Sequence, residues 1–255
     1  AITDETILVS IMHANNEIGT IQPIKQIGEI CKEKNVLFFV DACQSFGKLE
    51  INVKDMKIDL LASTAHKLYG PKGIGLLYIC QKDPKISLEM QMDGGGHERG
   101  YRSGTLPVPL IVGFSKAMEI SVQKKESEYH SLGKLRNLLL NGIKSKHSDI
   151  ILNGDSKNSL SHNLNLCFPN LEAETIIMKM KGIACSVGSA CSSNSLEPSH
   201  VIKALGHNNE LAHSAIRFSV GRFTTQTEIE KAIFEINSVV SFLKSKRKKR
   251  VKQNF

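Results

Sequence analysis

One lysine of the chain stands where a strand-like run gives way to a turn rich in glycine and proline. Ser63 and Thr64 end the run, His66 and Lys67 follow, and residues 70–73 read Gly-Pro-Lys-Gly. Ligands of α/β proteins bind at such strand ends, and a lysine amine of depressed pKa is a nucleophile toward carbonyl carbons. The hydroxyls and the histidine suit a phosphate. The segment therefore favours a phosphate-bearing ligand held as a Schiff base, with an ordinary surface lysine as the alternative.

A carboxylate ends a second apolar run. Asp41 follows residues 36–40 (VLFFV) and precedes Gln44. An unpaired buried carboxylate is costly, so Asp41 needs a partner or a ligand. A pyridinium nitrogen is one such partner, because the carboxylate keeps this nitrogen protonated and so preserves the electron-accepting character of the ring. A strand-end turn or a helix N-cap, where Asp is common, is the alternative.

A thiol lies in a segment of small polar residues. Residues 186–193 read SVGSACSS and include Cys191, and a further polar segment, residues 13–17 (HANNE), directly follows the apolar run 6–12. A nucleophilic cysteine needs exposure and freedom to reach its target, and small neighbours give both. An incidental cysteine in a Ser/Gly linker is the alternative. Cys191 is thus the candidate nucleophile of the chain.

The elements that must position these residues alternate in the first half of the chain. Short apolar runs of the kind buried in parallel sheets flank a helical pattern that places Ile24, Ile27, Ile30 and Cys31 on one face. Strand, helix and strand in this order predict a right-handed parallel crossover and an α/β sheet. A long helical stretch from 109 to 146 leads into a mixed region. The expected strands are 6–12, 36–40, 60–63, 74–79, 163–168 and 216–220, and the other expected helices are 23–34, 172–181, 198–205 and 227–244.

Composition narrows the class of protein. Of the net charge of +8, residues 244–252 supply seven basic side chains and no acid, so the rest of the chain is nearly neutral. Such a tail is more often a solvated, frayed end than a nucleic-acid site, and nucleic-acid binding is not expected. No apolar run approaches the ~20 residues that span a bilayer, and no secretory signal is visible. The six cysteines form no C-x-x-C pair, which argues against zinc or disulfides and favours a reducing, intracellular setting.

Taken together, these segments resemble one family, the cysteine desulfurases of iron–sulfur cluster assembly within the class V aminotransferase group. The resemblance extends from Thr6 to about Lys244, and motifs of this length in this order are highly specific. Its further motifs are GGGHERGYRSGTLP at 94–107, SAC at 189–191 paired with LEPS at 196–199, and AHSAIRFSVGRFT at 212–224. The resemblance implies an α/β fold, that of the pyridoxal-phosphate-dependent transferases of fold type I.

The resemblance also implies a domain organisation. Residues 1–122 would form the C-terminal part of a large cofactor-binding domain with a mainly parallel sheet. Residues 123–244 would form a small α+β domain that carries the Cys191-bearing segment, and residues 245–255 a basic tail. The family's N-terminal segment, with a Thr-bearing glycine-rich turn for the phosphate and a His that stacks on the pyridine ring, has no counterpart in this sequence. A chain truncated in this way would bind the cofactor weakly or fail to fold, and its exposed sheet edges would invite aggregation.

The implied reaction converts L-cysteine to L-alanine. Lys67 would hold pyridoxal 5′-phosphate and move protons at the substrate Cα, and Cys191 would attack the substrate sulfur and become a persulfide. Arg217, through a fork of two hydrogen bonds, and Asn16 would grip the substrate carboxylate. The expected cofactor-binding residues are Asn16, Asp41 at the pyridine nitrogen, Gln44 at the ring oxygen, Thr64 and His66 at the phosphate, Lys67, and Thr105 at the phosphate of the partner subunit.

The family further implies the partners and the compartment. The sulfur would pass to an iron–sulfur scaffold protein and also serve tRNA thiolation, and Cys191 would transiently bridge an iron–sulfur cluster as a metal ligand. The protein would be a homodimer without a membrane partner, in the mitochondrial matrix of a eukaryote or the cytoplasm of a bacterium. Two alternatives stay open. One is a selenocysteine lyase, and the other is a catalytically impaired, truncated paralogue that acts as a binding subunit.

Overall fold

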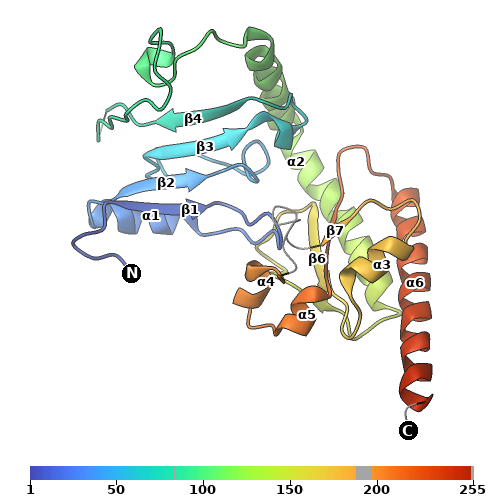
Figure 1. Cartoon of the computed structure of the whole chain (residues 1–255). Helices are drawn as coiled ribbons and strands as arrows, with labels where there is room; N and C mark the ends of the chain where they lie inside the picture. The colour runs from blue at the N-terminus through green and yellow to red at the C-terminus, as the bar shows by residue number, and fades with distance from the viewer. Residues whose placement is uncertain (83, 188–196, 254–255) are drawn as a thin grey trace. The chain divides into compact units, whose positions relative to one another are not determined.

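The computed structural model describes residues 1–82, 84–187 and 197–253. The chain forms two compact units: Ala1–Ala14 with Gln22–Lys125, and Asn15–Ile21 with Glu126–Phe255. Helix α2 (Val108–Lys144) begins in the first unit and ends in the second (Figure 1). These compact units do not show which domains the chain contains. The expected domain ranges 1–122, 123–244 and 245–255 therefore stay predictions.

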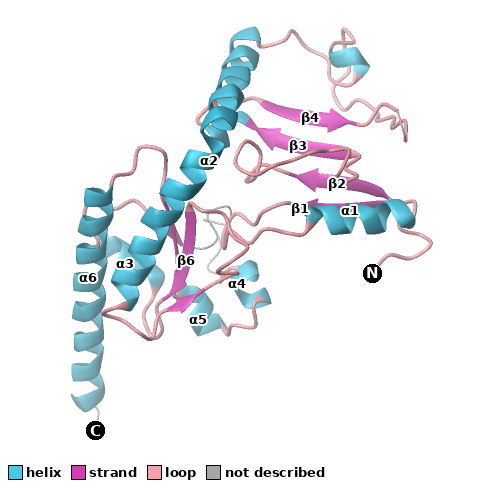
Figure 2. Ribbon diagram, turned by 180° about the vertical axis from the view of Figure 1, so that it is seen from behind, coloured by secondary structure: helices cyan, strands magenta, loops and turns pink. Residues whose placement is uncertain are grey.

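The first unit is built on a four-stranded sheet in the order β1-β2-β3-β4, whose strands lie side by side in Figure 2. Strands β1 to β3 are parallel and β4 is antiparallel to β3. The sheet is therefore mainly parallel, as expected. The elements of this unit are β1 Leu8–Met12, α1 Ile24–Glu33, β2 Leu37–Asp41, β3 Leu60–Thr64, the 3₁₀ helix η1 Ala65–Leu68, β4 Gly75–Ile79 and the 3₁₀ helix η2 Glu98–Gly100.

The apolar pattern of the sequence explains this unit. Ile24 and Cys31, on the predicted helical face of α1, pack in one core cluster with Phe38 and Val40 of β2, as a βαβ crossover requires. The antiparallel direction of β4 has a simple cause, since only the ten residues 65–74 separate it from β3. A parallel return needs a connection of a dozen or more residues, so this short turn reverses the chain.

The second unit contains an entirely antiparallel sheet in the order β5-β6-β8-β7. Helices accompany it, so the expected small α+β region is present. The elements are β5 Ile151–Leu152, β6 Asn163–Cys167, α3 Ala173–Lys179, β7 Ser186–Val187, α4 His200–Ala204, α5 Asn209–His213, β8 Ala215–Ser219 and α6 Gln226–Gln253. Strands β5 and β7 and helix α5 are not among the expected elements, because they are too short to show a hydrophobic period.

The two faces of this sheet differ in chemistry. Leu164 and Leu166 of β6 lie in the main core cluster of the unit with residues of α2, α3 and α6. The alternate residues Asn163 and Asn165 bond instead to the segment 15–21. Because side chains alternate along a strand, one face of the sheet is an apolar core and the other presents polar groups.

The C-terminal basic residues continue a helix. Helix α6 extends to Gln253, so the predicted helix end at Lys244 is wrong. Lys244 Nζ lies 2.5 Å from Asp149 Oδ1, and Lys246 Nζ lies 4.8 Å from the centre of the Phe242 ring. These contacts tie the start of the basic stretch to the folded unit. None of the helices in the described part of the chain is both long and apolar enough to cross a membrane.

Candidate functional site

Three polar residues lie at the carboxyl ends of adjacent parallel strands in the first unit. Met12 pairs with Asp41 in register, and Asp41 pairs with Ala62 two residues before Thr64. The backbone N–H of His13 donates to the Asp41 carbonyl at 2.8 Å. This edge is where open α/β sheets bind ligands, so the fold brings His13, Asp41 and Thr64 to one ligand-binding edge.

Lys67 lies on η1, directly after this edge. Its neighbours Ala65 and Leu68 are fully buried and pack in one cluster with Phe114 and other residues of the first unit. Tyr69 then adopts a left-handed conformation (φ 64°), which ends the 3₁₀ helix. The backbone beneath Lys67 is thus held by packing on both sides, while the Lys67 side chain itself stays half-buried.

Asp41 and Lys67 both act on one thiol, that of Cys43. The Cys43 N–H donates to Asp41 Oδ1 at 2.8 Å. Burial, together with a hydrogen bond to Asp41, raises the pKa of the Cys43 thiol to about 11, while the charge of Lys67 acts in the opposite direction. Asp41 and Lys67 therefore influence the same thiol in opposite directions. Cys43 is not among the residues expected from the sequence, although its place two residues after Asp41 is a usable signal.

The remaining expected cofactor residues of the first unit follow β2 and β3 or precede α2. Thr64 Oγ1 lies 2.9 Å from His66 Nδ1, so one hydroxyl and one exposed ring are held together at the end of β3. Gln44 is half-buried in the turn after β2, where its carbonyl accepts from Lys48 Nζ at 3.2 Å. Thr105 is exposed, three residues before α2 begins. The structure thus brings together the residues after β2 and β3.

The two expected carboxylate-binding residues meet in the second unit. Arg217 of β8 donates from Nη1 to the Asn16 carbonyl at 2.9 Å, and Asn163 Nδ2 reaches the same oxygen at 3.4 Å. Arg217 is half-buried and pairs in register with Asn165 on one side and Ser186 on the other. A planar guanidinium fixed at one edge can offer its other N–H groups to a carboxylate.

The turn that carries Asn16 is held by its own hydrogen bonds. Asn15 Oδ1 accepts from the backbone N–H groups of Glu17 at 2.8 Å and Ile18 at 3.0 Å. Gly19 has φ 75°, and a Cβ added there would lie 3.1 Å from Asn163 Cβ. Glycine at this position therefore permits both the left-handed turn and the close approach of β6.

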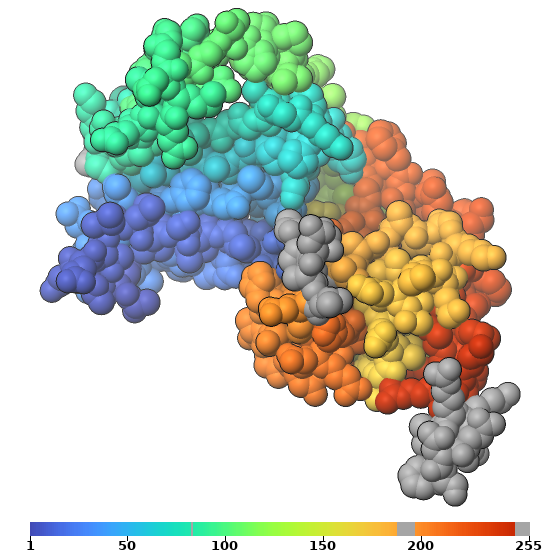
Figure 3. All heavy atoms as spheres, viewed as in Figure 1, coloured from blue at the N-terminus to red at the C-terminus, as the bar shows by residue number. Residues whose placement is uncertain are grey.

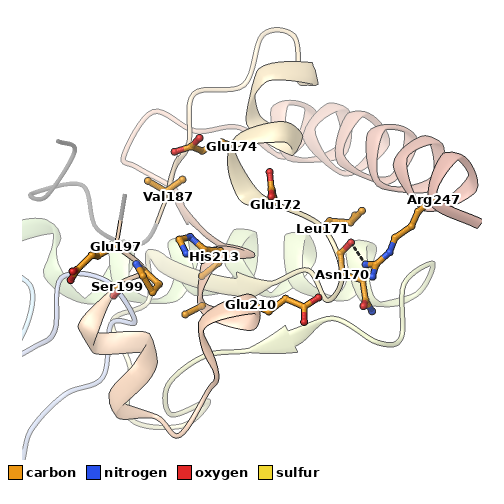
Figure 4. A pocket seen from close by; sticks show the side chains of 13 residues that line it. Asn170, Leu171, Glu172, Glu174, Val187, Glu197, Ser199, Glu210, His213 and Arg247 are labelled. Atoms are coloured by element: carbon orange, nitrogen blue, oxygen red, sulfur yellow. Dashed lines mark hydrogen bonds between the residues drawn. The ribbon is translucent and has the colours of Figure 1, made fainter. Parts of the chain in front are cut away.

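A cavity of about 640 Å³ opens beside α4 and α5 of the second unit. Figure 4 shows Glu172, Glu174, Glu197 and Glu210 around it with His213, while Arg247 donates to the Asn170 carbonyl at its far end. In Figure 3 the orange surface of α4 and α5 lies next to the yellow residues that precede β7. Four carboxylates repel phosphates, so this cavity does not suit a nucleic acid or a phosphorylated cofactor.

Burial keeps most of the described thiols protonated, because it raises their pKa. It raises the pKa of Cys31, Cys167 and Cys185, the last to about 11. Since the thiolate is the nucleophile, these cysteines are poor candidates for sulfur chemistry. Cys191 lies outside the described residues, and its expected roles as nucleophile and as metal ligand stay predictions. No group of three or more metal-binding side chains occurs within 1–82, 84–187 and 197–253.

These features define a class of protein. The family model described as aminotransferase class-V matches residues 1–232, so the chain belongs to this family. Its curated relatives include Cysteine desulfurase IscS of Vibrio cholerae serotype O1 (strain ATCC 39541 / Classical Ogawa 395 / O395), 54% identical over 245 residues, which are 96% of this chain and 60% of the relative. Cysteine desulfurase IscS of Histophilus somni (strain 2336) is 54% identical over 95% of this chain and 60% of its own length. The chain therefore spans about 60% of the length of these relatives, and the resemblance to cysteine desulfurases is confirmed.

Solved structures agree on the fold. A NifS-like protein matches with a TM-score of 0.85 at 35% identity, over 94% of this chain and 63% of that one. DndA from Streptomyces lividans matches with a TM-score of 0.71 at 34% identity, over 86% and 62% of the two chains. A structure of SspA in complex with cysteine matches with a TM-score of 0.71 at 36% identity, over 88% and 62%. The predicted fold class is confirmed.

Pyridoxal phosphate is the cofactor of this family, and the first unit fits it. His13 Nδ1 and Ser63 Oγ are buried and have no hydrogen-bond partner among the described residues. Both residues lie at or near the carboxyl ends of β1 and β3, where a ligand would supply the missing partners. Asp41 would face the ring nitrogen, Thr64 and His66 the phosphate, and Lys67 the carbonyl carbon. The donor set therefore suits a phosphorylated pyridine aldehyde.

Proposed function

We propose that this chain carries a cysteine desulfurase activity, in which L-cysteine gives L-alanine and a persulfide on Cys191 for iron–sulfur cluster assembly. The observation that carries the proposal is that Asp41 and Thr64 end adjacent parallel strands, with Lys67 on the 3₁₀ helix directly after β3, in a chain of the class V aminotransferase family. The identity of 54% to Cysteine desulfurase IscS supports the choice of reaction. A structural relative, SspA, is described in complex with cysteine, which supports the choice of substrate.

Each residue would have one task. The bound cofactor supplies an electron sink for the carbanion that develops at the substrate Cα. Asp41 would hold the proton on the pyridine nitrogen, Lys67 would take the Cα proton, and Arg217 with Asn16 would bind the carboxylate. Gln44, Thr64 and His66 would hold the cofactor, and Thr105 would approach the phosphate of the partner subunit.

The sulfur transfer balances without a further reagent. The Cys191 thiolate attacks the substrate sulfur, an S–S bond forms, and the C–S electron pair stays on the substrate Cβ. Protonation of Cβ completes L-alanine. One cysteine and one enzyme thiol thus become one alanine and one enzyme persulfide, so no external oxidant or reductant is needed.

The test uses the full-length protein incubated with pyridoxal phosphate and then with L-cysteine. We expect a visible absorbance band that requires Lys67, shifts on addition of L-cysteine, and accompanies formation of alanine. Lys67→Ala should abolish the band and lower turnover by about 10³-fold, the range in which removal of an acid–base group falls. Cys191→Ala should keep the band but form no persulfide.

Matched outcomes separate the alternatives. A protein that binds pyridoxal phosphate but forms alanine only from selenocysteine is a selenocysteine lyase. A protein without a Lys67-dependent band is a binding subunit, and the proposed function is then wrong.

The oligomeric state, the sulfur acceptors and the cell compartment are part of the same proposal. We propose a homodimer that passes sulfur to an iron–sulfur scaffold protein, with Cys191 as a transient bridging ligand of the cluster and tRNA thiolation as a second use of the sulfur. The curated relatives named above are bacterial, which supports a bacterial cytoplasm. A mitochondrial matrix location has no such support.

A further inference from the structure

A carboxylate is buried next to the candidate substrate-binding turn. Glu17 is 4% exposed, and its Oε2 accepts a hydrogen bond of 2.6 Å from Ser199 Oγ. A buried carboxylate is costly unless hydrogen bonds satisfy it. Burial raises the pKa of Glu17, whereas the Ser199 hydroxyl and the charges of His200 and Arg217 oppose this rise. The roles proposed for Asn16 and Lys67 do not require a carboxylate at position 17.

The Ser199 hydroxyl has one proton, and the hydrogen bonds around it show that this proton is donated to Glu17. Ser199 is the N-cap of α4, where its Oγ accepts from the N–H groups of Val201 at 3.2 Å and Ile202 at 3.3 Å. A hydroxyl accepts at two lone pairs and donates one proton. With both lone pairs occupied, the proton goes to Glu17, so the direction of this hydrogen bond is fixed. Glu17 therefore holds a residue that lies eight positions after Cys191.

The other end of the same segment is attached to Arg217. Ser186 and Val187 of β7 pair with Arg217 and Ile216 of β8, directly before the residues that precede Cys191. Arg217 in turn donates to the carbonyl of Asn16, the residue before Glu17. The described residues on either side of Cys191 are thus held at Ser186 by Arg217 and at Ser199 by Glu17.

We propose that Glu17 is a positioning residue, which anchors the C-terminal end of the Cys191-bearing segment to the substrate-binding turn through Ser199. The inference rests on the proposed function, because its effect is the delivery of the Cys191 thiol to the substrate sulfur. Glu17 touches neither substrate nor cofactor in this role. The strand partners of Arg217 are Asn165 and Ser186, not Glu17, so loss of the Glu17 side chain should slow sulfur transfer more than it weakens substrate binding.

The test measures two quantities in the full-length holoenzyme. One is the single-turnover rate of persulfide formation on Cys191, and the other is the dissociation constant for L-cysteine from the spectral change on binding. Glu17→Ala should slow transfer by about 10-fold, the lower range for loss of an orienting partner, with little change in the dissociation constant. Ser199→Ala should slow transfer by at least as much, because it removes the same hydrogen bond and the N-cap of α4 as well.

Two further variants separate positioning from general damage. Glu17→Gln should restore most of the rate, because its amide oxygen can accept the Ser199 proton at nearly unchanged volume. The double variant Glu17→Ala/Ser199→Ala should be no slower than Ser199→Ala alone, since the Glu17–Ser199 hydrogen bond is already lost in Ser199→Ala. If Glu17→Ala does not fold, Glu17→Gln and Ser199→Ala still give the rates needed.

The possible outcomes distinguish failure of the inference from failure of the proposed function. Normal transfer in Glu17→Ala and Ser199→Ala overturns the inference while the proposed function stands. A rate in Glu17→Gln as low as that in Glu17→Ala, or a dissociation constant that rises as much as the rate falls, also overturns it. A wild-type protein that forms no alanine from L-cysteine overturns the proposed function first, and the inference fails with it.

Discussion

Arg217 shows how a single side chain is prepared for a ligand. It lies in the central strand β8, paired with Asn165 and Ser186, and one edge of its guanidinium is fixed by the Asn16 carbonyl. A guanidinium held at one edge loses less conformational freedom when its remaining N–H groups bind a carboxylate. Arg217 is thus better prepared to bind a carboxylate in one geometry than an arginine on the surface would be.

We therefore predict distinct effects of two substitutions at Arg217. Arg217→Ala should raise the KM for L-cysteine by about 10- to 100-fold, the range expected for loss of hydrogen bonds to a charged group. Arg217→Lys keeps the charge but loses the fork, so its KM should lie between those of wild type and Arg217→Ala. The measurement is steady-state alanine formation, with Arg222→Lys, an arginine paired with Glu128, as the control. An unchanged KM in Arg217→Ala would refute the assigned role.

The thiols give a second prediction for single residues. Cys43 and Cys185 have pKa values of about 11, so near neutral pH their thiolate fraction is over 100-fold below that of a thiol of pKa ~8.5. Iodoacetamide should therefore label Cys191 well before Cys43 or Cys185, as peptide mass spectrometry of timed samples would show. Equal labelling rates for Cys43 and Cys191 would contradict the assignment of Cys191 as the nucleophile.

At the level of elements, close approach of backbones matters more than helix propensity. Gly28 lies inside α1, and a Cβ added there would lie 2.0 Å from the carbonyl oxygen of Met56. Gly133 lies inside α2, where an added Cβ would have only Ser161 Cβ nearby, at 3.9 Å. Both are helical glycines, yet only the first is required by packing.

This contrast predicts opposite signs for the same substitution. Gly28→Ala should lower the free energy of unfolding by about 3 kcal/mol or more, because overpacking against a backbone atom cannot be relieved by a side-chain rotation. Gly133→Ala should raise it by about 0.5–1 kcal/mol, since alanine favours a helix over glycine. Urea unfolding followed by circular dichroism measures both values. A destabilised Gly133→Ala would show that contacts of α2 decide the outcome instead.

For the whole molecule, buried histidines couple stability to pH. Burial lowers the pKa of His13 and His147 below the ordinary value of 6.5. Between the lowered value and 6.5 the unfolded chain binds more protons than the folded one, so stability falls as pH falls through this window. Each histidine contributes a slope of at most about 1.4 kcal/mol per pH unit.

The pH prediction is tested by variants that cannot titrate. We expect the free energy of unfolding to be lower at pH 5.5 than at pH 7.5. His147→Gln should reduce this difference, and His13→Gln/His147→Gln should reduce it further. Urea titrations at the two pH values measure the differences. A double variant with the same pH dependence as wild type would show that other groups cause it.

The sequence by itself determined the larger elements and the chemistry of the cofactor edge. The apolar runs before Asp41 and Thr64 predicted strands, and strands β2 and β3 end at these residues. Local patterns suffice there because a buried parallel strand must be apolar along its length and its ligand must bind where it ends. The direction of β4 does not follow from its apolar pattern, because period and composition are the same for both directions; it follows from the short connection to β3, residues 65–74.

Only the tertiary structure decided which distant residues act together. Glu17 and Ser199 are 182 positions apart, as their shared hydrogen bond records, and nothing in either local segment indicates the other. Arg217 and Asn16 likewise meet only because β8 lies beside the segment 15–21 within the second unit. Chain connectivity predicts strand ends and turns, whereas a buried polar pair exists only after two surfaces have folded against each other and excluded water.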